Sequence, residues 1–298
     1  MTTNKDAFRD YLQLEKKYSP HTLTAYCADI ASFESFNKIH FEEQGIEQAG
    51  YSQIRSWIIV LVDDGVSNGS VNRKIASLKA FYKFLLKTKQ IRVSPLSGHK
   101  ALKASRVLQV PFSEKEVLNV LDQMQNTIGF EEVRNKLIID LLYTTGMRRA
   151  ELIQLQIANI DLSNSTIKVL GKRSKERILP VLPVLAAQFC LYLKERALLV
   201  IVADNAYFFL TKKGLKLNDS FVYRLINSYF SGVSEKVKKS PHILRHTFAT
   251  HLLNNGADLN SVKELLGHSS LASTQIYTHS SLSEIKNIYK EAHPRGRK

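Results

Sequence analysis

Six residues in the second half of the chain have side chains that together suit attack on a phosphodiester without a metal ion. A tyrosine supplies a nucleophile, histidine and lysine transfer protons, and two arginines are permanent cations for a phosphate. Each residue type is commonplace alone, so the pattern depends on their order and on the turns that carry them. The six residues are Arg148, Lys172, His242, Arg245, His268 and Tyr277.

Two of the six are expected at the start of a helix. Ser240 followed by Pro241 is typical of an N-cap and a first helical position, so His242 and Arg245 fall in the first turns and share a face. The free amides and the dipole of a helix N-terminus attract phosphate. His242 and His246 are also four residues apart, but there is no HExxH motif and no suitably spaced Cys or Glu. We therefore expect a phosphate site and no metal.

Arg148 is expected at the start of another helix. Gly146 should end the preceding helix, and the next begins at Arg148. Glu151, three residues on, can orient the guanidinium. An Arg–Glu pair on a helix is more often a structural ion pair than a catalytic device, so this pair gains its meaning from the other residues.

The remaining three residues lie in a predicted hairpin and near the end of the chain. Lys172 falls in the turn between two short β-type runs, at residues 166–170 and 177–181. A helix is expected over residues 259–266 and should stop at Gly267, which places His268 directly after it. Ser270 can cap a further short helix that carries Tyr277. Lysines in turns and tyrosines on helices are common, so neither residue is informative alone.

Composition indicates a polyanionic partner. Lys and Arg exceed Asp and Glu by 42 to 27 in 298 residues, which gives a formal charge of +15 and a pI of about 9.7. Nucleic acid is the simplest such partner, against the alternative of an ordinary basic surface. The two cysteines, Cys27 and Cys190, indicate neither a disulfide framework nor a zinc site. The polar N-terminus and the lack of a long apolar run predict a soluble, cytoplasmic protein.

The periodicity predicts a mainly α protein with two domains and one small β-hairpin. Residues 1–95 should form a helical domain, residues 96–112 a linker, and residues 113–298 a second, mostly helical domain. Helix signals in the first domain are Ser19-Pro20, residues 52–64 closed by Gly65, and a start at Ser70; Ser113 and Glu116 form a capping box that opens the second. The helix from Ser70 has a basic face, which is either an ordinary solvated stripe or a contact for a polyanion. It consists of Lys79, Lys83 and Lys87.

Five segments resemble the catalytic boxes of the tyrosine recombinases, also called the phage integrase family. Within this family, the segments and the N-terminal residues 19–36 and 71–95 are most similar to the Xer recombinases (XerC and XerD) of bacterial chromosome-dimer resolution. Two positions depart from the usual pattern, Arg149 and Arg173, and neither replaces a catalytic group. The five segments are Thr145-Gly146-Met147-Arg148-Arg149-Ala150-Glu151-Leu152, Gly171-Lys172 with Lys175-Glu176-Arg177, Pro241 to Thr250, Leu266-Gly267-His268, and Ile276-Tyr277-Thr278-His279.

The resemblance implies a mechanism that uses no metal, cofactor or ATP. Tyr277 would attack the scissile phosphate to form a 3′-phosphotyrosyl link, with the nonbridging oxygens held by Arg148 and Arg245. His242 would act as the base, while Lys172 would protonate the departing 5′-oxygen. His268 would hydrogen-bond the phosphate, and Glu151 would support Arg148. A covalent intermediate of this kind preserves the energy of the phosphodiester, so strands can be exchanged and resealed.

The resemblance also implies partners. Residues 1–95 would be a SAM-like core-binding domain that clamps double-stranded DNA together with the catalytic domain. On its recombination site the protein would form a tetramer, alone or with a second Xer-type recombinase, and would work with a septal DNA translocase like FtsK. The segment beyond Tyr277 would dock on a neighbouring subunit, with packing on its own domain as the alternative. Its apolar residues are Leu282, Ile285, Ile288 and Tyr289.

Three other functions are compatible with parts of the pattern. An integrase or invertase of a mobile element would use the same chemistry for another purpose. An architectural DNA-binding protein could have the fold without cutting, but it has no need of Tyr277. A metal-dependent nuclease would need clustered carboxylates, which the motifs do not contain. We therefore expect a site-specific DNA recombinase, most similar to the Xer group.

Overall fold

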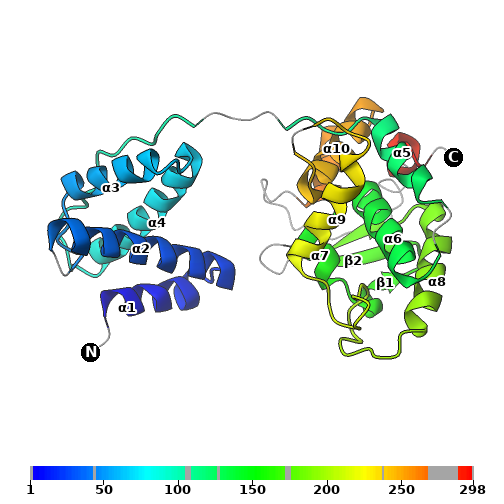
Figure 1. The fold of residues 1–298 in the computed structure, drawn as a ribbon, viewed down its shortest axis with the longest axis horizontal. Helices are drawn as coiled ribbons and strands as arrows, with labels where there is room; N and C mark the ends of the chain where they lie inside the picture. Colours follow the sequence, from blue (N-terminus) through cyan, green and yellow to red (C-terminus); the bar gives the residue numbers. More distant parts are fainter. Residues whose placement is uncertain are drawn as a thin grey trace. The chain divides into compact units, whose positions relative to one another are not determined.

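The chain forms two compact units, residues 1–107 and 108–298 (Figure 1). The computed structural model describes residues 3–42, 45–104, 109–125, 128–171, 176–236, 238–267 and 288–296. Helices dominate both units and the described strands form one small sheet in the second, which confirms the predicted mainly α class. Within these ranges, no helix is both long and apolar enough to cross a membrane.

Helices of the first unit begin at caps that the sequence mostly indicated. Ser19 caps the second helix through a hydrogen bond from the Thr22 amide, as predicted. The last helix begins earlier than expected, because Ser67 is its N-cap and Ser70, the predicted start, donates its amide to the Ser67 hydroxyl at 3.3 Å. The helices are α1 (Asn4–Asp10), a π-helical stretch (Tyr11–Glu15), α2 (Pro20–Phe41), α3 (Tyr51–Asp63) and α4 (Asn68–Lys87).

The first unit extends beyond its helices into the segment that follows α4. Leu96 is buried in the same core as Trp57, and Leu102 packs against that core. The Asn72 side chain holds the Leu102 backbone with two hydrogen bonds of 2.8 and 2.9 Å, one to the carbonyl and one from the amide. The expected linker, residues 96–112, therefore includes residues that belong to the first unit. On α4, the three lysines of the predicted basic face are exposed, and Lys79 Nζ donates to the His99 carbonyl at 3.2 Å.

The second unit combines one small sheet with the helices α5 to α11. The sheet is antiparallel with the order β1-β2-β3, and Ile167 pairs with Leu179 across its centre. The predicted hairpin is thereby confirmed, with its second strand one residue earlier than expected. The elements are α5 (Glu114–Gln123), α6 (Phe130–Thr145), α7 (Arg149–Gln154), a 3-10 turn (Ile157–Asn159), β1 (Ile160–Asp161), β2 (Thr166–Leu170), β3 (Glu176–Pro180), α8 (Pro183–Ala197), α9 (Asp219–Ser231), α10 (Pro241–Asn254) and α11 (Leu259–Leu266).

Helix α6 lies at the centre of the second unit. Every residue from Leu137 to Thr145 is buried, and α6 packs against α8 and α10. Because this part of α6 is buried on all sides, the packing of the surrounding core fixes its position. It ends at Gly146, which adopts a left-handed conformation with φ of 60°. Arg148 follows two residues later, so the core of the unit sets the position of this arginine.

The described part of the C-terminal segment packs on its own unit. Tyr289 is buried in a cluster with Phe248 and Leu252, and its hydroxyl donates to the Thr144 carbonyl. For Tyr289 the alternative of packing on its own domain therefore holds in this structure. Leu282 and Ile285, which belong to the same predicted amphipathic segment, lie outside the described residues.

Gly146 provides a test of this arrangement. A Cβ added to Gly146 would lie 2.3 Å from the buried Phe248 ring, and a side chain at this φ is itself strained. Gly146→Ala should therefore lower the free energy of unfolding of the second unit by about 2–4 kcal/mol, from overpacking and left-handed strain together. Gly256→Ala is the matched control, because Gly256 has φ of 90° but nothing within 4 Å of its added Cβ. Urea unfolding should give about 1 kcal/mol for the control. Equal losses would contradict the packing argument.

Candidate active site

Arg148 is held at the start of α7 by Glu151. Its backbone amide donates to Glu151 Oε2 at 2.7 Å, and its Nη1 donates to Glu151 Oε1 at 2.8 Å. This reciprocal arrangement is a capping box in which an arginine occupies the N-cap. The predicted orienting role of Glu151 therefore has a direct structural basis. The side chain of Arg148 remains partly exposed.

Arg245 approaches the same place from α10, whose predicted N-cap Ser240 accepts a hydrogen bond from the Ile243 amide. The Arg245 guanidinium is buried, and it donates to the Gly146 carbonyl through Nη1 and to the Leu266 carbonyl through Nη2, both at 2.5 Å. Burial, with the positive charges of Arg148 and Arg177, lowers the pKa of Arg245 to about 10. The two predicted arginines, 97 positions apart in the sequence, thus lie in one cluster.

The last turn of α11 joins the two arginines. Arg148 Nη2 donates to the Gly267 carbonyl at 3.2 Å, next to the Leu266 carbonyl that accepts from Arg245. Helix C-termini leave carbonyls without helical partners and carry partial negative charge, so cations are stabilised there. Gly267 ends α11 in a left-handed conformation, as predicted. This turn leads directly to His268 in the sequence.

A third arginine, Arg177, completes the cluster; it belongs to one of the five resembling segments but was not predicted as a site residue. Arg177 on β3 makes a two-pronged ion pair with Glu151, with N–O distances of 2.7 and 2.8 Å. Burial acts to raise the pKa of the Glu151 carboxyl, but the hydrogen bonds and charge of Arg177, together with Arg148, outweigh it and hold this pKa below its ordinary value. The signal for Arg177 was a charged residue at an inward-facing strand position, two residues before the buried Leu179.

Of the other four predicted site residues, the structure describes only His242. His242 lies in the first turn of α10 and is exposed, whereas Arg245 on the same helix is buried. Lys172, His268 and Tyr277 lie outside the described residues. In the part of the chain that the structure does describe, no group of three His, Cys, Asp or Glu residues is placed to hold a metal ion.

The two unusual arginines have different outcomes. Arg149, next to Arg148, turns to α9, where its Nη2 lies 3.1 Å from Asp219 Oδ2. This exposed ion pair links α7 to α9 and leaves the Arg148 contacts intact. Arg173 lies outside the described residues.

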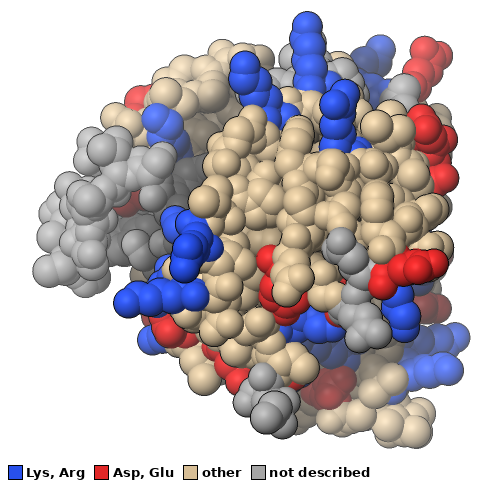
Figure 2. All heavy atoms as spheres, turned by 90° about the vertical axis from the view of Figure 1, so that its left-hand side faces the viewer, with Lys and Arg blue, Asp and Glu red and all other residues tan. Residues whose placement is uncertain are grey.

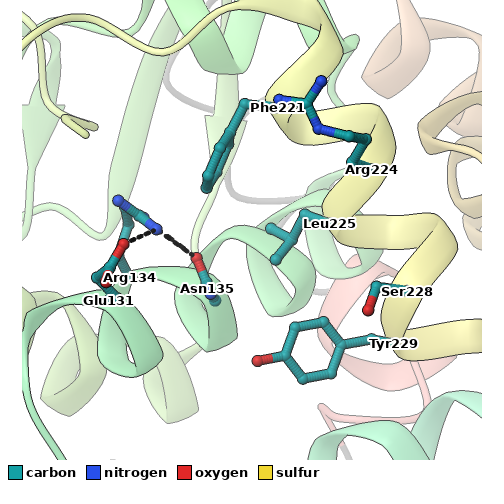
Figure 3. Close-up of a pocket in the computed structure, with 8 residues that line it drawn as sticks. All are labelled: Glu131, Arg134, Asn135, Phe221, Arg224, Leu225, Ser228 and Tyr229. Atoms are coloured by element: carbon teal, nitrogen blue, oxygen red, sulfur yellow. Dashed lines mark hydrogen bonds and ion pairs between the residues drawn. The ribbon is translucent and has the colours of Figure 1, made fainter. Parts of the chain in front are cut away.

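A separate cavity of about 380 Å³ lies between α6 and α9 (Figure 3). Arg134 from α6 lies beside it, with Nε and Nη2 donating to Asn135 Oδ1 and Nη1 donating to the Leu210 carbonyl. The Phe221 ring lies 4.6 Å from the Arg134 guanidinium carbon. These contacts are the internal anchoring of a buried arginine. None of the described members of the predicted site lines this cavity.

Among the residues that the structure describes, Glu151 is the one carboxylate that pairs with Arg148 and Arg177, and its charge can be tested. Glu151→Gln should lower the free energy of unfolding of the second unit by about 3–5 kcal/mol, because it leaves buried guanidiniums without their counter-charge. Asp219→Asn, which removes the exposed partner of Arg149, should cost less than about 1 kcal/mol. Because the pKa of Glu151 is lowered by folding, its contribution is full above about pH 4.3 and is lost as the pH falls further. Urea titrations at pH 7 and pH 3.5 should therefore show a difference from wild type that shrinks in acid. A difference independent of pH would contradict this account.

Comparison with known families covers both units. Residues 111–284 match the phage integrase family, and residues 6–89 match the N-terminal SAM-like domain of phage integrases. The chain is 35% identical to tyrosine recombinase XerC of Chlorobaculum parvum, over 97% of this chain and 94% of the relative. It is also 35% identical to XerC of Bacillus subtilis (97% and 95%) and to XerD of Shewanella oneidensis (98% and 96%).

Solved structures share the fold of this chain. One is a XerH site-specific recombinase bound to a palindromic difH substrate in a post-cleavage complex, with a TM-score of 0.71, 21% identity, and coverage of 98% of this chain and 82% of that one. Another is the Tn1549 transposon integrase with circular intermediate DNA, with a TM-score of 0.71, 20% identity, and coverage of 95% and 99%. The family matches and the full-length relatives agree with one another. The chain therefore belongs to the phage integrase family of tyrosine recombinases and is a site-specific recombinase.

Proposed function

We propose that Arg148 and Arg245 bind the scissile phosphate of a DNA recombination site and that Tyr277 attacks it. The observation that carries this proposal is the convergence of both guanidiniums on the last turn of α11. A guanidinium has five N–H donors. Side-chain hydrogen bonds to the protein use two donors of Arg148 and two of Arg245, so each arginine keeps donors for the two nonbridging oxygens.

The charge of the cluster favours an anion. Three arginines, Arg148, Arg177 and Arg245, share one carboxylate, Glu151, which leaves a net charge of +2. The mutual repulsion is one cause of the lowered pKa of Arg245. A phosphate that gains negative charge in a pentavalent transition state relieves this repulsion. Each such donor can contribute about 3 kcal/mol to transition-state stabilisation, by analogy with oxyanion holes.

The remaining groups supply the proton transfers. The tyrosine hydroxyl has an ordinary pKa of about 10, so Tyr277 needs a base at neutral pH. The exposed His242, in the first turn of the helix that carries Arg245, is our candidate for that base. Lys172 protonates the 5′-oxygen as it leaves, and His268 hydrogen-bonds the phosphate. Each such proton transfer typically accelerates a reaction by about 10²- to 10⁴-fold.

Both units bind DNA in this proposal. The net charge of +15 is the sequence-wide support, and on the face in Figure 2 Lys and Arg side chains are spread around the edges, several of them at the top. In the first unit, α4 exposes Lys79, Lys83 and Lys87. Affinity should fall about 10³-fold or more with a modest rise in salt if several phosphates are neutralised.

The biological role that we propose is resolution of chromosome dimers. The XerC and XerD names of the full-length relatives support it. We infer a tetramer on the recombination site, formed with copies of the chain or with a second Xer-type recombinase, and activation by a septal DNA translocase. The protein would then act in the cytoplasm, on chromosomal DNA at cell division.

A covalent adduct tests the chemistry. The full chain is incubated in excess chelator with nicked DNA that carries a site selected from genomic DNA by affinity for the protein. We expect a denaturant-resistant adduct at the 3′ end of the cut strand, and at least a 10³-fold lower yield from Tyr277→Phe, because the nucleophile is lost. Tyr223→Phe on α9 is the matched control, and its yield should equal that of wild type.

Two results would contradict the proposal. One is an adduct that persists in Tyr277→Phe, and the other is cleavage that requires a divalent metal. If a verified site gives no adduct even with a partner recombinase and translocase supplied, a non-cutting, architectural function would replace this one.

A further inference from the structure

Arg177 has an unusual environment for a charged residue. It lies on β3 with 6% of its surface exposed, on the inward-facing side of the sheet. Its Nη1 and Nη2 donate to the two carboxylate oxygens of Glu151, and its Nε donates to the Leu265 carbonyl at 3.0 Å. All three nitrogens of the guanidinium therefore have a partner, which fixes the plane of the group.

Three consecutive carbonyls of α11 each accept from a different arginine. Leu265 accepts from Arg177, Leu266 accepts from Arg245, and Gly267 accepts from Arg148. Because Gly267 has no side chain, Arg177 can lie across this turn, and a Cβ at Gly267 would be 3.0 Å from Arg177 Cδ. The turn thus spaces the guanidiniums, and Arg177 is the one that also holds Glu151.

The charges in the cluster indicate that Arg177 contributes through its hydrogen-bonding geometry rather than through its positive charge. Its positive charge adds to the repulsion in a cluster that already contains Arg148 and Arg245, and it is one cause of the lowered pKa of Arg245. A neutral residue would reduce that repulsion. An arginine can hold a carboxylate with two parallel hydrogen bonds and so fix its orientation, which lysine cannot do.

We propose that Arg177 is a positioning residue for strand cleavage: it orients Glu151, and through Glu151 and the last turn of α11 it sets the position of the Arg148 guanidinium. This inference rests on the proposed role of Arg148 as a phosphate ligand. Arg177 itself does not touch the phosphate. By analogy with metal sites, the loss of a residue that orients a ligand-binding side chain typically lowers activity by about 10- to 100-fold.

The chain offers a matched control in Arg196. This arginine is also buried, with 8% of its surface exposed, and it belongs to the same unit. Its Nη2 donates to the carbonyls of Asn205 and Tyr207, away from the cluster. Arg177→Lys keeps the charge but loses the two parallel hydrogen bonds to the carboxylate, and Arg177→Gln keeps a donor but loses the charge. Arg196→Lys and Arg196→Gln make the same changes elsewhere.

The first readout is the single-turnover rate of adduct formation on nicked DNA. All variants are assayed below the temperature at which thermal unfolding begins, so that a folding defect is not mistaken for a catalytic one. We expect Arg177→Lys and Arg177→Gln to cleave about 10- to 100-fold more slowly than wild type, with DNA affinity changed less than about threefold. The Arg196 variants should cleave within about threefold of wild type. Wild-type rates in both Arg177 variants would overturn the inference.

The second readout separates positioning from general weakening of the unit. Sulfur replaces one or the other nonbridging oxygen of the scissile phosphate, and Arg148→Lys identifies the diastereomer whose rate reports on Arg148. In Arg177→Lys and Arg177→Gln the rate ratio of the two diastereomers should move towards the Arg148→Lys value, whereas the Arg196 variants should keep the wild-type ratio. An unchanged ratio in both Arg177 variants would overturn the inference while leaving the proposed function intact. Failure of the wild-type protein to form an adduct would instead overturn both.

Discussion

The site of this recombinase depends on the C-terminal end of α11, whose carbonyls accept hydrogen bonds from three arginines. Guanidiniums repel one another, and three of them meet in the second unit with Glu151 as their shared carboxylate. The terminal carbonyls of α11 make this possible, because they offer partial negative charge at spacings fixed by the helix. Carbonyls and carboxylate together hold the arginines without neutralising them. The excess positive charge is what an anionic transition state can use.

The second constraint is the turn between α6 and α7. Gly146 lets the chain reverse against the Phe248 ring, and its carbonyl accepts from Arg245. The same turn therefore delivers Arg148 and anchors Arg245. Because α6 is buried along its last two turns and more, this turn moves only if the core of the unit moves. The site residues that the structure describes are thus fixed by tertiary packing, which suits electrostatic preorganisation.

Local signals predicted the elements well, and tertiary contacts account for what was missed. The caps at Ser19, Ser113 and Ser240 and the stops at Gly146 and Gly267 depend on adjacent residues, so the sequence could indicate them. The start of α4 was misplaced because Ser67 and Ser70 are both good caps, and the Ser67 hydroxyl accepts the Ser70 amide.

The site shows the same division between local and tertiary information. The pairing of Arg148 with Glu151 spans three residues and was predictable, whereas Arg177 reaches Glu151 across 26 residues and Leu265 across 88. Its place in the segment Lys175-Glu176-Arg177 and its charge at an inward-facing strand position were the signals for it in the sequence. Helical spacing placed His242 and Arg245 on one face, but it could not show that one is exposed and the other buried.

The central claim is that Arg148 and Arg245 form a metal-free site for the scissile phosphate. The most direct test is a crystal structure of the covalent complex with nicked DNA, prepared in chelator. The account predicts that the phosphate linked to Tyr277 has its two nonbridging oxygens within about 3 Å of donors from Arg148 and Arg245, next to the Leu266 and Gly267 carbonyls. A phosphate bound elsewhere, or held by a metal ion in place of these arginines, would contradict it.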